Sequence, residues 1–152
     1  MRSTRRWTHA SQDPELRSAI LAKALEGMAG RPVMPRVAER INDLMAFIQT
    51  QLEVSLTVEE MAAEAGMSVN SLIVHFTSVT GRTPAQYMLR QRLRRACWFL
   101  MNRPLSVAEI AFATGFSSHA HLCAVFRRKL GMSPGELRRR HRSAIVPPAW
   151  EE

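Results

Sequence analysis

The sequence predicts an all-α protein in which two helix-turn-helix units are joined by a long connecting helix, with an extra helix near the N-terminus. Three observations lead to this fold class. Apolar residues recur at three- and four-residue steps through most of the chain, which is the spacing of one helix face. Capping residues and glycines bound the periodic stretches. One pattern occurs twice, with the second copy displaced by about fifty residues, and we find no convincing strand.

The repeat is defined most clearly by its glycines. Gly66 pairs with Gly115 at an offset of 49, and Gly81 pairs with Gly131 at an offset of 50, because one residue is inserted after the turn of the second copy. Each copy consists of a short capped helix, a turn that contains glycine and a second helix. This order is typical of the helix-turn-helix motif, so one supersecondary unit is expected twice.

The remaining helices begin and end at similar signals. Asp13 and Pro14 start the extra helix, and leucines on two of its sides predict that it packs on the rest of the protein. In chain order, helices are expected at about residues 13–28, 35–52, 57–65, 68–80, 83–101, 106–114, 117–130 and 133–142. The corresponding divisions are an N-terminal tail, helix and linker over 1–35, a double helix-turn-helix domain over 36–142, and a disordered tail over 143–152.

The connecting helix has the clearest start signal. Thr83 is suited to the N-cap, Pro84 to the first helical position, and Gln86 completes a capping box. An apolar face and several outward arginines follow. The apolar face comprises Leu89, Leu93, Ala96 and Leu100, and the arginines are Arg90, Arg92, Arg94 and Arg95.

The second helix of each unit has an inward and an outward face at 100° per residue. In the first unit, Leu72, Phe76 and Val79 are expected in the core. In the second unit the inward residues are Leu122, Val125, Phe126 and, more loosely, Leu130. Either Ser117 or Ser118 caps this last helix.

Composition and charge narrow the class of protein. Hydrophobic residues make up 46% of the 152, which excludes a disordered chain, and no apolar run is long enough to cross a membrane. Cys97 and Cys123 both fall on predicted helices, so we expect no disulfide framework and a cytoplasmic location. The net charge is +8, with a local +11 over residues 82–142 and −4 over 36–81. A concentrated basic half favours nucleic acid as partner; a solvated basic face without a partner is the alternative.

Residues 36–142 resemble the DNA-binding domain of the AraC/XylS transcription regulators. The resemblance rests on positions in both copies, which are Gly66, Ser68, Leu72, Phe76, Gly81, Pro84, Tyr87, Arg92, Leu93, Ala96, Ile110, Ala111, Gly115, Phe116, Phe126, Gly131 and Pro134. It implies seven helices, two recognition helices, and a sequence-specific regulator that is not an enzyme and needs no cofactor. It implies double-stranded DNA as partner, with RNA polymerase as a candidate second partner, and we expect a monomer or weak dimer. About 35 residues precede the match, so the chain is similar either to stand-alone members or to a fragment of a longer one.

The outward faces of the two recognition helices supply the expected base-reading residues, because the major groove admits one helix. They are Asn70, Ile73, Val74, Thr77, His121 and Ala124. The family often has arginine two residues before the core phenylalanine, where this chain has Val74 and Ala124. The apolar residues either contact thymine methyl groups or face another part of the protein, for which the extra N-terminal helix is a candidate. Val74 and Ala124 also favour a runner-up function, a protein-binding regulatory module that has lost specific DNA reading, whereas the local charge of +11 opposes it.

Phosphate contacts are expected from helix N-termini and basic side chains. The candidates are Ser68, Thr83, Gln86, Arg90, Arg92, Ser117, Ser118, Arg127 and Arg128. Arg92 has a structural alternative as an ion-pair residue, and the stretch from Arg138 to Arg142 has the alternative of a solvated basic helix end.

A metal site is the main rival chemistry, because His119, His121 and Cys123 are residues of the types that bind zinc. On a helix these three side chains spread over about 200°, so they do not converge on one ion and no metal site is expected. A Cys–His nucleophile pair is equally weak, because both cysteines fit core positions.

Overall fold

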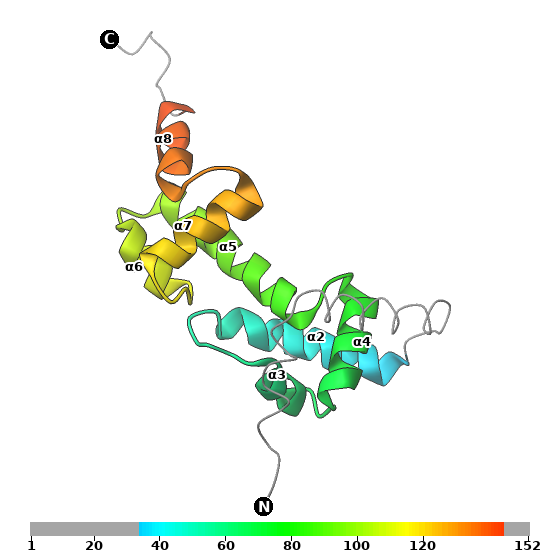
Figure 1. The fold of residues 1–152 in the computed structure, drawn as a ribbon. Coiled ribbons are helices and arrows are strands. Elements are labelled where there is room, and N and C mark those ends of the chain that lie inside the picture. Colours follow the sequence, from blue (N-terminus) through cyan, green and yellow to red (C-terminus); the bar gives the residue numbers. More distant parts are fainter. Residues whose placement is uncertain (1–33, 145–152) are drawn as a thin grey trace, which may run out of the picture. The chain divides into compact units, whose positions relative to one another are not determined.

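The computed structural model describes residues 34–144, and every regular element among them is a helix (Figure 1). The helices are α2 (Pro35–Thr50), α3 (Val58–Glu64), α4 (Val69–Thr80), α5 (Pro84–Asn102), α6 (Val107–Ala113), α7 (His119–Leu130) and α8 (Pro134–Ala144). The all-α prediction and the continuous connecting helix, α5, are confirmed. The helix expected over 13–28, and its packing, lie outside the described residues, as does the tail from 145 onward.

The described chain divides into two compact units. Unit 1 comprises residues 34–45 and 58–84 and contains the helix pair α3 and α4. Unit 2 comprises residues 46–57 and 85–144 and contains the helix pair α6 and α7, together with α8 and α5 beyond Pro84. Each unit therefore holds one helix-turn-helix, and the end of α2 with the loop that follows it belongs to unit 2.

Unit 1 is built on the predicted caps. Ser68 is the N-cap of α4, and its Oγ accepts a hydrogen bond from the backbone N–H of Ser71 at 3.2 Å. Gly81 ends α4 in the left-handed conformation. The buried apolar residues of this unit are Ile41, Leu44, Met61, Ala62, Ala65, Leu72 and Phe76.

Two expectations for α4 are wrong. Val79, expected in the core, is 37% exposed, whereas Thr77, expected on the outward face, is only 7% exposed. A helical wheel gives a direction around the axis, but it does not tell which neighbouring element covers that direction at a given turn. The Thr77 hydroxyl oxygen is also buried and has no hydrogen-bond partner, so Thr77 leaves the set of candidate base-reading residues.

Unit 2 has one core cluster, formed where α5, α6 and α7 pack together. Its buried members are Leu93, Ala96, Leu100, Ile110, Ala111, Phe116, Leu122, Val125 and Phe126. The capping box of α6 is complete, with Ser106 N–H donating to Glu109 Oε2 at 2.7 Å and Glu109 N–H donating to Ser106 Oγ at 3.1 Å. Ser118, rather than Ser117, is the N-cap of α7. Leu130, expected loosely inward, is 41% exposed because it occupies the last turn before the C-cap.

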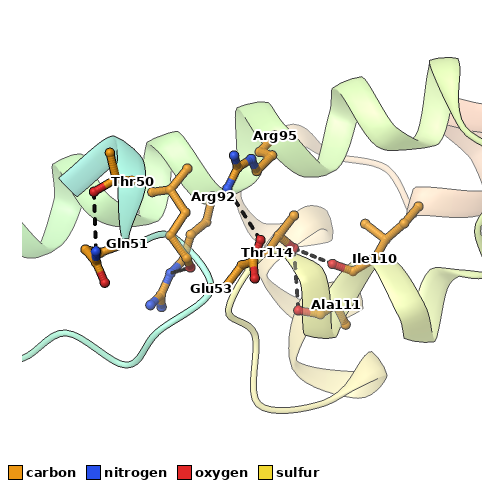
Figure 2. A network of polar contacts seen from close by, with 9 residues as sticks. Thr50, Gln51, Glu53, Arg92, Arg95, Ile110, Ala111 and Thr114 are labelled. Atoms are coloured by element: carbon orange, nitrogen blue, oxygen red, sulfur yellow. Dashed lines mark hydrogen bonds and ion pairs between the residues drawn. The ribbon is translucent and has the colours of Figure 1, made fainter. Parts of the chain in front are cut away.

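Arg92, on α5, is hydrogen-bonded to the loop that follows α2 (Figure 2). Its Nε donates to the carbonyl oxygen of Leu52 at 3.0 Å and its Nη2 to that of Val54 at 2.6 Å. The turn between α6 and α7 closes on the same place. Gly115 has φ +76°, and a Cβ built there would lie 2.1 Å from the Leu52 oxygen and 2.7 Å from Arg92 Nε. Only glycine fits this position, on both conformational and steric grounds.

Arg138 plays a comparable part at the other end of α5. Its Nε donates to the carbonyl oxygen of Leu100 at 3.3 Å and its Nη2 to that of Leu105 at 2.5 Å. The helix that carries it starts with a second complete capping box, made by Ser133 and Glu136. The interpretation of residues 138–142 as a merely solvated end is therefore wrong for Arg138, which ties α8 to the end of α5.

Candidate nucleic-acid interface

The candidate interface consists of two patches, one on each unit. On α4 of unit 1, Asn70 is exposed, and its amide makes no hydrogen bond within the described residues. Ile73 and Val74 are half-buried. The outward face of α4 thus offers one free amide, which is a donor and an acceptor, beside two partly covered apolar side chains.

On α7 of unit 2, the N-terminal half presents His121 and Ala124, both exposed. The imidazole of His121 is held in place from two sides. Its Nδ1 lies 3.0 Å from Ser117 Oγ, and its ring meets the Phe116 ring edge-on, with centroids 5.4 Å apart. A fixed ring with its other nitrogen unpaired can donate to or accept from a base edge, according to its tautomer.

The C-terminal half of α7 is basic. Arg127 and Arg128 are exposed and make no side-chain hydrogen bond or ion pair with any described residue. Lys129, which was not among the expected contacts, is exposed as well. Three consecutive cations in the last turn also interact favourably with the negative end of the helix dipole, but their charged ends remain available to a polyanion.

The cap serines combine a structural and a potential binding role. Ser68 Oγ and Ser118 Oγ each accept a backbone N–H three residues later, at 3.2 Å and 3.1 Å. An oxygen that accepts in this way leaves its hydroxyl proton free to donate, and the helix N-terminus itself favours an anion. Ser117, by contrast, has its hydroxyl against His121.

The candidate phosphate contacts on and beside the connecting helix differ in how accessible their side chains are. Arg90 is exposed and has no partner among the described residues, and Gln86 is exposed in the first turn, whereas Thr83 is half-buried. The guanidinium of Arg92 already donates hydrogen bonds to the two carbonyl oxygens described above, and its burial lowers the pKa of Arg92 by desolvation. We therefore assign Arg92 a structural role instead of the expected phosphate contact. The predicted structural alternative is an ion pair, whereas the observed partners are backbone carbonyl groups.

The two units differ sharply in charge. The described part of unit 1 carries Arg36, Arg40 and Arg82 against five acids, a formal −2. The described part of unit 2 carries twelve Arg and Lys against three acids, a formal +9. Within unit 2, Arg95 and Glu53 form a partly exposed ion pair, with 3.9 Å between nitrogen and oxygen. Attraction to a polyanion is thus concentrated on unit 2.

Comparison with known proteins agrees with this arrangement. The profile of a family described as a helix-turn-helix domain matches residues 61–140, more than half of the chain. The chain belongs to this family, and its paired units place it among the AraC-type members. The transcriptional activator RhaS of Klebsiella pneumoniae strain 342 is 35% identical over 107 residues, which cover 70% of this chain and 38% of that protein. The chain therefore matches about two fifths of the length of this relative.

Two solved structures have the same fold. The DNA-binding domain of AdpA, a global transcriptional factor crystallised with a target DNA, has a TM-score of 0.67 and 34% identity, covering 69% of this chain and 95% of that one. An AraC-type transcriptional regulator from Chromobacterium violaceum has a TM-score of 0.64 and 27% identity, covering 68% and 92%. Within residues 34–144, no helix is both long and apolar enough to cross a membrane.

Proposed function

We propose that this protein is a non-enzymatic transcriptional regulator of the AraC/XylS type that binds double-stranded DNA through α4 and α7. The observation that carries the proposal is the exposed, unpaired Arg127 and Arg128 on the second helix of a helix-turn-helix, in a unit with a formal charge of +9. The likeness to the AdpA domain, whose structure was solved with a target DNA, supports it.

We assign different roles in DNA binding to the two patches. Unit 1 presents a mostly uncharged face on α4, with Asn70 as its polar group, so we assign base reading mainly to this unit. The helix α7 combines His121 and Ala124 with the cations at its C-terminal end, so we assign phosphate anchoring mainly to unit 2. RNA polymerase as a second partner and the monomeric or weakly dimeric state remain predictions.

The test is a fluorescence-anisotropy titration of labelled duplex DNA with purified protein at several salt concentrations. Affinity should fall linearly on a log–log plot against salt, because each phosphate contact releases condensed counterions. Arg127→Ala should weaken binding to all duplexes similarly and reduce the magnitude of the salt slope by about 1. Arg103→Ala is the matched control, because it removes the same charge from unit 2 but lies beyond α5, over the ring of Trp98 at 5.3 Å.

Two results decide against the proposal. Absence of binding at low salt would favour the protein-binding regulatory module instead. Equal effects of Arg127→Ala and Arg103→Ala on affinity and slope would mean that the net charge of unit 2, rather than the end of α7, attracts the DNA.

A further inference from the structure

His119 and Cys123 meet on one side of α7. They are four residues apart, so they lie one above the other on the same helix face, and His119 Nε2 is 3.6 Å from Cys123 Sγ. His119 is exposed and Cys123 is half-buried, so the space between them is open to solvent. The 200° spread that separates His119 from His121 does not apply to this pair.

The distance between the two atoms fits a shared metal ion. Zinc binds thiolate sulfur at about 2.3 Å and imidazole nitrogen at about 2.0–2.1 Å, with roughly tetrahedral angles, which places the two ligand atoms about 3.6 Å apart. The pair thus already stands at the separation that coordination demands. A thiol-to-imidazole hydrogen bond has a similar length and is the competing interpretation.

We propose that His119 and Cys123 form a two-residue site for a thiophilic divalent cation, Zn²⁺ in the first place. On binding, Sγ releases its proton to the buffer and binds as thiolate, while Nε2 uses its lone pair and Nδ1 keeps the ring proton. Water completes the coordination, because no third His, Cys, Asp or Glu side chain joins the pair in the part of the chain that the structure describes. The site gains one net positive charge.

The chain contains its own controls for this site. His121 lies on another side of the same helix, and its Nδ1 is turned to Ser117. Cys97 packs against the core of unit 2, and burial raises the pKa of its thiol, which makes it a poor metal ligand. The proposed site therefore predicts that metal binding depends on His119 and Cys123 and is independent of His121 and Cys97.

The site also bears on DNA binding, and this step rests on the proposed function. His119, Cys123 and Arg127 follow at four-residue steps, so the pair borders the face of α7 assigned to DNA. A bound ion with its waters would occupy space beside Arg127. We therefore expect Zn²⁺ to weaken DNA binding by steric exclusion, despite its positive charge.

The first arm of the test contains no DNA. Reduced, tag-free, full-length protein is titrated with Cd²⁺, and the thiolate-to-cadmium charge-transfer band is followed. The band should saturate at one ion per chain in the wild type, Cys97→Ser and His121→Gln, and disappear in Cys123→Ser. In His119→Gln the affinity should fall by about tenfold or more, because even outer-shell partners of metal ligands contribute on that scale. A band that is unchanged in His119→Gln, or lost in Cys97→Ser, would overturn the site and leave the hydrogen bond.

The second arm measures duplex affinity with and without Zn²⁺, and with a chelator added back. The wild type should lose affinity reversibly, and Cys123→Ser should show the same affinity in both conditions. Cadmium binding with no zinc effect on DNA affinity would overturn the regulatory part alone. Failure to bind DNA in metal-free buffer would contradict the proposed function, and the cadmium arm would still decide the site.

Discussion

Replacing Gly115 by alanine should destabilise unit 2 far more than the same change at Gly131. Both glycines follow a helix of the second helix-turn-helix and have similar left-handed φ values, +76° and +68°. Their surroundings differ. A Cβ at Gly115 would meet the Leu52 carbonyl oxygen at 2.1 Å and Arg92 Nε at 2.7 Å, whereas nothing lies within 4 Å of a Cβ at Gly131.

The expected magnitudes follow from these contacts. Alanine in the left-handed region costs about 1–2 kcal/mol at either position. At Gly115 the overlap with a backbone oxygen adds roughly 1–3 kcal/mol, as in other overpacked sites. Displacement of Arg92 from Leu52 adds up to about 1.5–3 kcal/mol for a hydrogen bond made by a charged donor. Gly115→Ala should therefore cost about 2–8 kcal/mol, depending on how far Arg92 is displaced, and Gly131→Ala about 1–2 kcal/mol.

Urea unfolding followed by Trp98 fluorescence measures the difference in unit 2 itself. Trp98 lies on α5, so changing Trp7 and Trp150 to phenylalanine in every variant leaves one reporter in that unit. A Gly115→Ala protein that is already unfolded without urea agrees with the expectation, provided that Gly131→Ala remains folded. Equal losses for the two variants would show that the contact with Leu52 and Arg92 does not constrain the turn.

Three further predictions concern single side chains. Arg92→Ala should lose about 2–4 kcal/mol of stability, and Arg92→Lys should lose most of this as well, because an ammonium cannot donate to both carbonyl oxygens in the fixed fork geometry of a guanidinium. Urea unfolding checks this, with Arg94→Ala, which removes an exposed arginine of the same helix, as the control. The backbone N–H of Ser106 lowers the pKa of Glu109, so its carboxylate stabilises the folded protein above the unfolded pKa, and this contribution is lost as pH falls through the folded pKa. The stability difference between wild type and Glu109→Gln should accordingly shrink below about pH 4.3 in thermal unfolding, and a constant difference would contradict the assignment. Asn70→Ala should weaken a selected site by about 1–3 kcal/mol more than random duplex in competition binding, and equal losses would remove Asn70 from base reading.

The features that the sequence predicted well are set by local rules. Ser106 with Glu109, and the four repeat glycines with positive φ, each depend on neighbours within a few residues. Helix boundaries therefore followed from capping and glycine signals. The choice between Ser117 and Ser118 stayed open because both precede the helix, and only the backbone geometry identifies the cap.

The errors come from contacts that are distant in sequence. The partners of Arg92 are backbone oxygens 38 and 40 residues away, and a carbonyl acceptor leaves no mark in the sequence. Thr77 is buried where exposure was expected, and Val79 is exposed where burial was expected, because a helical wheel ignores the neighbouring elements. The contact between His119 and Cys123 is the exception, because it is local: considering His119, His121 and Cys123 as one set of three concealed it, although the four-residue spacing could have revealed it.

The close contacts of Arg92 and Gly115 with the loop after α2 have a consequence for how such a chain can evolve. The repeat suggests a duplicated module, yet the second copy depends on residues 46–57, which precede the first copy's own helix pair. A segment that starts at the connecting helix would contain Arg92 and the Gly115 turn but would lack the loop that both of them contact. The two halves of the repeat are consequently not interchangeable parts, and recombination between homologues should preserve function best when residues 46–57 are inherited together with residues 85–144.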